Sequence, residues 1–142
     1  MRAGILRARA ADDEGTVLLL TLGYALLALV LVLVCADATS LYLAQKRTDA
    51  LADAAALAAA DGFVLTVDRG EPVAELTDAG VREQAEAIVA TVGGAVLVSA
   101  GTPDGVSARA TVATTWHPPI VSLFVPDGIR LESTATSRTA LN

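Results

Sequence analysis

The sequence predicts an α+β protein in which a long N-terminal helix is followed by a small antiparallel sheet with one helix packed on it. Three observations indicate this fold. Gly15–Ala36 contains no charged residue, and the alanine-rich stretch that follows has no proline. From Phe63 onwards, short alternating apolar and polar stretches are separated by Gly and Pro turns. The 142 residues therefore divide into four expected parts: 1–14, 15–36, 37–62 and 63–142.

The apolar run Gly15–Ala36 is long enough to cross a membrane. Its 22 residues, as a helix, extend roughly 33 Å, and the hydrocarbon core of a bilayer is about 30 Å thick. A chain of this size has too little further sequence to surround such a helix with protein. We therefore expect residues 15–36 to form a single transmembrane helix.

The orientation of this helix follows from the basic residues near its ends. Arg2, Arg7 and Arg9 precede the run, whereas Lys46 and Arg47 follow it at a distance of ten residues. Basic residues accumulate on the cytoplasmic side of membrane proteins. The sequence thus predicts a cytoplasmic segment 1–14, with everything after residue 36 outside the cell membrane.

A cleaved secretory signal is the alternative interpretation of the same run. Ala36-Asp37-Ala38 has the small-x-small form of a cleavage site. However, the apolar region of a signal peptide usually has 7–15 residues and follows a basic segment, and here Asp12-Asp13-Glu14 stands directly before the run. In this alternative the protein is a secreted or envelope-associated binding module released by signal peptidase after Ala38.

The helix is expected to continue beyond the membrane. Ala, Leu, Gln, Lys and Arg, which favour helices, fill the stretch after Ala36. The sequence predicts one helix from about Thr16 to Asp61, ended by Gly62 as a C-cap. One stripe of this extension forms a candidate helix-packing face, because small side chains let helices approach closely. The face consists of Ala44, Leu51, Ala55 and Ala58, and either the chain's own C-terminal domain or a partner helix could cover it.

The C-terminal part alternates between strand and turn patterns. One helix is expected after an N-cap at Thr77 or Asp78, with Val81, Ala85, Ile88 and Val92 on its buried face and its end at Gly93-Gly94. Trp116 and Phe124 are expected to anchor the core. The expected strands are Phe63–Val67, Ala95–Ala100, Val106–Trp116, Ile120–Val125 and a last strand from Ile129.

Composition argues against several functions. Residues 37–142 carry 7 Lys and Arg against 13 Asp and Glu, and a nucleic-acid partner would need a basic surface. Cys35 and His117 are the only residues of their kinds, so neither an intrachain disulfide nor a histidine-based metal cluster is expected. No phosphate-binding or nucleophile motif occurs. We expect no catalytic residue, no cofactor, no metal and no small-molecule substrate.

The first half of the chain resembles a known family. The stretch "DEGTVLLLTLGYALLALVLVLVCADATSLYLAQKRTDALADAAALAAADG" is similar to the N-terminal region of actinobacterial TadE/TadG-like proteins of the Flp (tight-adherence) pilus system. The resemblance lies in the charged start before Gly15, the unbroken apolar helix, the segment Gln45–Asp53, and the alanine-rich end at Asp61-Gly62. It covers about 50 residues, whereas the C-terminal part matches only in style.

The resemblance implies a non-enzymatic, pilin-like minor component of a pilus-assembly or secretion apparatus. Such proteins contact other components of the apparatus, or copies of themselves, through the long helix. It also implies a candidate processing site for a prepilin peptidase at Gly15-Thr16. The family's processing motif has Glu at the fifth position after the glycine, and this chain has Leu20 there.

Overall fold

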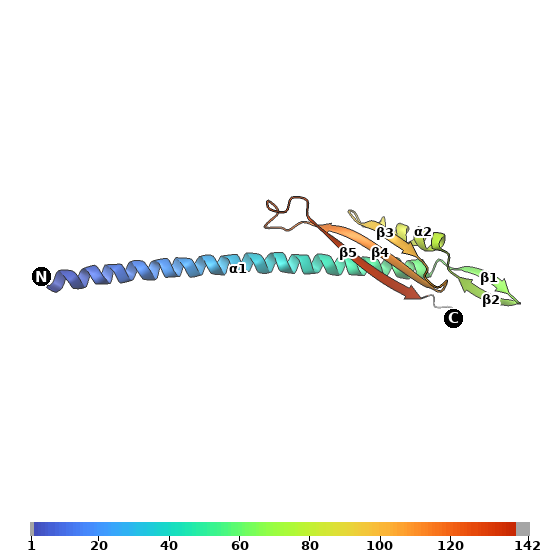
Figure 1. Cartoon of the computed structure of the whole chain (residues 1–142), viewed down its shortest axis with the longest axis horizontal. Coiled ribbons are helices and arrows are strands. Elements are labelled where there is room, and N and C mark those ends of the chain that lie inside the picture. The colour runs from blue at the N-terminus through green and yellow to red at the C-terminus, as the bar shows by residue number, and fades with distance from the viewer. Residues whose placement is uncertain (1, 139–142) are drawn as a thin grey trace. The chain divides into compact units, whose positions relative to one another are not determined.

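The computed structural model describes residues 2–138 and confirms the α+β class (Figure 1). The chain divides into two units, the first ending at Thr39 and the second beginning at Ser40. The elements are α1 (Arg2–Ala60), β1 (Val64–Asp68), β2 (Glu71–Glu75), α2 (Asp78–Val89), β3 (Val96–Gly101), β4 (Ser107–Trp116) and β5 (Ile129–Arg138).

Helix α1 is longer than predicted at its start and ends close to the predicted position. It begins at Arg2 rather than near Thr16. The reason is that the preceding segment is rich in Ala and Arg, and extending an existing helix through good helix formers costs little. The helix ends at Ala60, where the N–H groups of Asp61 and Gly62 bond back to Ala58 and Ala59 in a tighter turn.

Gly62 does not act as the predicted left-handed C-cap. It is absent from the glycines with positive φ among the described residues, which are Gly70, Gly94, Gly105 and Gly128. Instead, a Cβ at Gly62 would lie 2.8 Å from Cγ of Gln84 on α2, and a Cβ at Gly80 would lie 3.3 Å from the Gly62 carbonyl oxygen. The two glycines therefore let the end of α1 pass close to the start of α2.

The main sheet of the second unit has three antiparallel strands in the order β3-β4-β5. The central strand, β4, pairs with β3 from Val96↔Ala113 to Gly101↔Arg109, and with β5 over its whole length up to Trp116↔Ile129. A shift of register between Leu97 and Ser99 marks a bulge in β3. Strand β4 thus has a partner on both edges, and its backbone polar groups need no other element.

Both helices pack on one face of this sheet. The second half of α1 lies over β4 and β5, because Thr48 bonds Thr114 and Asp49 bonds Ser133. Helix α2 lies mainly against β3 (Figure 1). The second half of α1 therefore supplies part of the core of the small domain. The buried cluster consists of Leu51, Ala52, Ala55, Ala56, Ala59, Ala60, Leu76, Val81, Ala85, Val89, Ala108, Ala110 and Val112.

Strands β1 and β2 form a separate hairpin, which corrects the prediction of one small antiparallel sheet. The sequence predicted a strand at Phe63–Val67, close to β1, but no strand at Glu71–Glu75. The two strands pair from Val64↔Glu75 to Asp68↔Glu71. Arg69 and Gly70 both have positive φ, 50° and 92°, as a type I′ turn requires. Strand β2 was not predicted, because Arg-Gly is not among the dipeptides typical of type I′ hairpin turns.

Helix α2 starts where predicted and ends earlier. The Thr77 hydroxyl accepts a hydrogen bond from the Gly80 N–H at 3.2 Å, so Thr77 is the N-cap. Val81 and Ala85 are buried as predicted, but Val89 takes the next core position, and Val92 is 43% exposed. The C-cap at Ala90 explains the difference, because Val92 lies beyond the last helical turn.

The predicted strand Ile120–Val125 is wrong. Residues 117–128 form a loop of consecutive turns, in which the Phe124 N–H bonds the Val121 carbonyl at 2.9 Å. This segment instead connects β4 directly to its neighbour β5, and the two strands pair up to Trp116↔Ile129. Phe124 is also not a core residue, because it is 87% exposed. Trp116 is half-buried at the end of β4.

We predict that Gly128 is the glycine most sensitive to substitution in the second unit. It has φ 71°, and a Cβ there would lie 2.8 Å from the Trp116 carbonyl oxygen. Gly128→Ala should lower the free energy of unfolding by at least the roughly 1–2 kcal/mol of left-handed strain. Gly105→Ala, with φ 76° but open space, should show that strain alone, and Gly93→Ala should be near neutral. Equal unfolding temperatures for all three variants would refute this.

Asp104 fixes the turn between β3 and β4. Its carboxylate accepts hydrogen bonds from the Val106 N–H at 3.1 Å, the Ser107 N–H at 2.6 Å and the Ser107 hydroxyl at 2.9 Å. These donors, first the Val106 N–H, lower the pKa of Asp104 below its ordinary value of 3.8, against a smaller opposing effect of desolvation. The ionised carboxylate is therefore preferred in the folded state.

We predict a pH-dependent contribution of Asp104 to stability. Because the folded-state pKa is lowered, the contribution is present at neutral pH and is lost as the pH falls through that lowered pKa. Asp104→Asn should lower the unfolding temperature by a few degrees at neutral pH and less in acid. Asp53→Asn, at an exposed position of α1, controls for the loss of one negative charge. Identical pH profiles for Asp104→Asn and the wild-type chain would contradict the prediction.

Candidate assembly surfaces

The apolar run of α1 exposes its side chains along its length. Residues 15–36 are all exposed, and none of the most apolar window of the helix is buried. The Thr21 hydroxyl donates to the Val17 carbonyl at 2.8 Å, so this polar group is satisfied within the helix. By length and composition the helix can cross a membrane. The sequence analysis predicted this property from the same residues.

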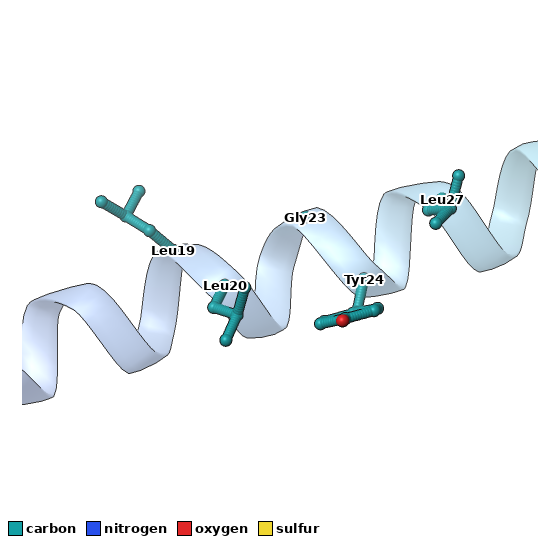
Figure 2. A pocket seen from close by; sticks show the side chains of 5 residues that line it. All are labelled: Leu19, Leu20, Gly23, Tyr24 and Leu27. Carbon is teal, nitrogen blue, oxygen red and sulfur yellow. The ribbon is translucent and has the colours of Figure 1, made fainter.

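Gly23 makes a shallow hollow on the surface of the run. The hollow has a volume of about 230 Å³ and is lined by Leu19, Leu20, Gly23, Tyr24 and Leu27 (Figure 2). Gly23 has no side chain, and a Cβ there would meet nothing within 4 Å. A small residue flanked by large apolar ones is a feature of helix contacts in membranes.

The candidate processing site, Gly15-Thr16, lies inside α1 and not at its start. Gly15 is exposed, and a Cβ there would also meet nothing within 4 Å. Leu20, which stands where the processing motif has Glu, is 60% exposed. A protease would therefore have to bind this segment as a helix or unwind it locally.

The structure places the four residues of the candidate helix-packing face in two different environments. Leu51 and Ala55 are buried against the sheet of the second unit, and Ala55 is 0% exposed. Ala44 and Ala58 are half-buried at the margins of this contact. The sequence stripe missed the rest of the buried face, which is Thr48, Ala52, Ala56, Ala59 and Ala60.

Buried Thr48 was not part of the predicted face, which contained only apolar residues. Thr48 is 1% exposed; its hydroxyl donates to the Ala44 carbonyl at 3.0 Å and shares a 2.6 Å hydrogen bond with the Thr114 hydroxyl. Treating Thr48 as a small buried residue gives the series 48, 52, 55, 59, whose spacings of four, three and four match one face of a helix. Thr48 links α1 to the central strand.

Two further polar contacts join α1 to the sheet. The indole N–H of Trp116 donates to the Ser40 hydroxyl at 3.1 Å. Asp49 accepts hydrogen bonds from Gln45 at 2.9 Å, from Ser133 and from Lys46 at 3.2 Å. These donors, with Gln45 first, lower the pKa of Asp49. The contacts fix the register of α1 along β4 and β5.

A cavity of about 450 Å³ lies where α1, the end of α2 and the end of β4 meet. It is lined by Ala44, Arg47, Thr48, Leu51, Val92, Thr114, Thr115, Trp116 and His117. His117 is exposed at its edge, and the lining includes no carboxylate or thiol that could act with it. Among residues 2–138 no group of three or more His, Cys, Asp and Glu side chains could hold a metal ion.

The opposite face of the second half of α1 is exposed and contains large apolar residues. Tyr42 is 62%, Leu43 50% and Leu57 59% exposed. Lys46 lies over the Tyr42 ring, 5.8 Å from its centre, and covers part of it. We call Tyr42, Leu43 and Leu57 the outward face of residues 40–60. Besides the hollow at Gly23, it is a second surface on which another helix could pack.

These features define a class of protein: an exposed apolar helix whose second half belongs to the core of a small α+β domain. Residues 15–62 match the family described as putative Flp pilus-assembly TadE/G-like. The resemblance that the sequence analysis found is therefore confirmed, and the chain carries a TadE/G-like segment from Gly15 to Gly62. No curated protein and no solved structure matches the chain.

We predict that Ala55 tolerates no larger side chain. Ala55→Leu should lower the free energy of unfolding by about 1–3 kcal/mol, the usual cost of overpacking a filled core. Ala54→Leu on the exposed side of the same helix should change it by less than about 0.5 kcal/mol. Thermal unfolding of the detergent-solubilised chain measures both. An unchanged midpoint for Ala55→Leu would mean that the contact with the sheet is not filled in solution.

Proposed function

We propose that the protein is a non-enzymatic, pilin-like minor component of a Flp-type (Tad) pilus-assembly or secretion apparatus. The match of residues 15–62 to the TadE/G-like family is the observation that carries this proposal. In this role residues 15–36 anchor the chain in the cell membrane, and the small domain meets other components on the far side. The family suggests a structural protein.

The surfaces of α1 support this role. The inward face of residues 40–60 packs on the chain's own sheet. Partners would therefore contact the exposed face of Tyr42, Leu43 and Leu57. Within the membrane, the hollow at Gly23 offers a place for another apolar helix. Other pilus-assembly components, or copies of this chain, are the proposed partners.

The proposed orientation places the N-terminus in the cytoplasm. It rests on Arg2, Arg7 and Arg9 before the apolar run, with Lys46 and Arg47 ten residues beyond it. The outer domain is acidic, because residues 37–142 carry 7 basic and 13 acidic residues. Attraction to acidic lipid headgroups therefore does not favour the reverse arrangement.

One observation supports the second candidate, a binding module released after Ala38. The second unit begins at Ser40, so cleavage after Ala38 would leave its contacts, including the bond from Trp116 to Ser40, intact. The released domain would then retain its core. This candidate differs from the first in the N-terminus of the mature protein.

We predict that the full-length protein remains in the membrane fraction after carbonate extraction. In a Cys35→Ser background, Pro103→Cys in the exposed loop between β3 and β4 should react with an impermeant thiol reagent on intact cells. Ala8→Cys should react only after the membrane is opened.

Two outcomes would contradict the proposal in different ways. Recovery of a soluble fragment beginning at Thr39 would establish the released module instead. Labelling of Ala8→Cys but not of Pro103→Cys on intact cells would reverse the orientation and leave the anchor in place.

A further inference from the structure

We propose that the loop 117–128 is a second membrane contact, which inserts apolar side chains into the surface of the bilayer beside the transmembrane helix. The inference rests on the proposed function, because it requires residues 15–36 to be anchored in the membrane. It goes beyond that function by giving the small domain a lipid-binding element of its own.

The loop exposes apolar side chains to an unusual degree. Leu123 is 90% and Phe124 87% exposed, the highest values among the exposed large hydrophobic residues of the described chain. Ile120 and Val121 add to the same segment at 38% each. A contiguous exposed apolar cluster marks an interaction site in most soluble domains.

The backbone of the loop holds these side chains outward. Pro118 is fully buried and fixes the start of the loop, while the pair Trp116↔Ile129 closes its two ends. Turn bonds join the Phe124 N–H to the Val121 carbonyl and the Gly128 N–H to the Val125 carbonyl. Leu123 and Phe124 are therefore presented by an ordered turn.

The base of the loop lies close to the point where the chain leaves the membrane. Trp116 bonds Ser40 at 3.1 Å, and Ser40 is four residues beyond Ala36, the end of the apolar run. Four residues span at most about 14 Å even when fully extended. This bound comes from chain length and holds for any arrangement of the two units.

The opposite end of the sheet has no such tether. The loop between β3 and β4 lies at the other end of β4, whose ten residues correspond to roughly 30 Å of strand. That loop contains Asp104, whereas residues 117–126 contain no Asp, Glu, Lys or Arg. The apolar loop 117–128, whose one charged residue is Asp127 near its end, is thus the loop that the Trp116–Ser40 bond ties to the end of the apolar run.

The chemistry of the loop favours lipid as its occupant. Aromatic and large aliphatic side chains enter the boundary between headgroups and acyl chains, where Trp and Phe are common. The domain is acidic, so headgroup charge does not attract it, and apolar burial must supply the contact. Insertion should therefore occur in zwitterionic vesicles, should not be increased by acidic lipid, and should not be weakened by salt.

The test uses the full-length chain in phosphatidylcholine vesicles, with and without phosphatidylglycerol, at low protein-to-lipid ratio. In the Cys35→Ser background, Phe124→Cys is labelled with the fluorophore NBD, and Pro103→Cys is the matched control on the other loop. We expect a blue-shifted emission at position 124, several-fold weaker quenching by iodide than at position 103, and strong quenching by lipids with a shallow nitroxide. Added salt should not weaken the protection or the lipid quenching at position 124.

The outcomes separate the inference from the proposed function. Equal iodide quenching at both positions, with the chain retained after carbonate extraction, would overturn the loop contact and leave the anchor. Protection from iodide without quenching by lipid nitroxides would overturn it in favour of a protein partner or second copy. Release of the chain by carbonate would contradict the proposed anchor itself, and with it the basis of the loop contact.

Discussion

The close packing of the alanine face of α1 on the small residues of β4 is the contact on which the second unit depends. Ala52, Ala55 and Ala59 on the helix and Ala108 and Ala110 on the strand are each 0% exposed. Side chains this small let the helix axis approach the sheet closely, and the buried area then comes from backbone and Cβ atoms. The domain has few aromatic residues because this contact leaves little space to fill.

Close packing of small side chains gives little directional specificity, and polar contacts provide it. An alanine face can shift along the sheet with a small change in packing energy, because no large side chain fits into one particular position on the other surface. The Thr48–Thr114 hydrogen bond and the Trp116–Ser40 hydrogen bond fix the helix against β4 at two points, and Asp49 fixes it against β5. Because Thr48 is fully buried, losing its partner would leave an unsatisfied hydroxyl in the core.

The two halves of the continuous helix α1 therefore lie in different environments. Its second half is a core element of the small α+β domain, and its first half exposes apolar side chains among the described residues. The family match spans both halves, from Gly15 to Gly62. It therefore covers the part of the core that α1 supplies but not the sheet that completes it.

The sequence determined the elements whose patterns are local. The uncharged run from Gly15, the Thr77 cap, the alternation of Ala108, Ala110 and Val112, and the TadE/G-like resemblance were all readable from neighbouring residues. The start of α1, the pairing of β2 and the turns at Ile120–Val125 were not. The start of α1 depends on how far a helix extends through residues that merely permit it. The pairing of β2 and the turns at Ile120–Val125 depend on how these segments pair or turn in the folded chain.

Only the tertiary structure decided which small residues of α1 face the sheet and where Phe124 lies. Sequence spacing placed Ala44 and Ala58 in the buried stripe with Leu51 and Ala55, but the true face is centred on Thr48, Ala52 and Ala59. In a stretch where almost every residue is alanine, periodicity cannot distinguish faces, and the sheet selects one through the Thr48–Thr114 bond. Phe124 is a residue type typical of cores, yet its segment forms the turns between β4 and β5 and leaves the ring 87% exposed. Whether an aromatic ring is buried depends on the space that other elements leave for it. That space is set by residues distant in the sequence, so the neighbours of the ring in the sequence do not reveal it.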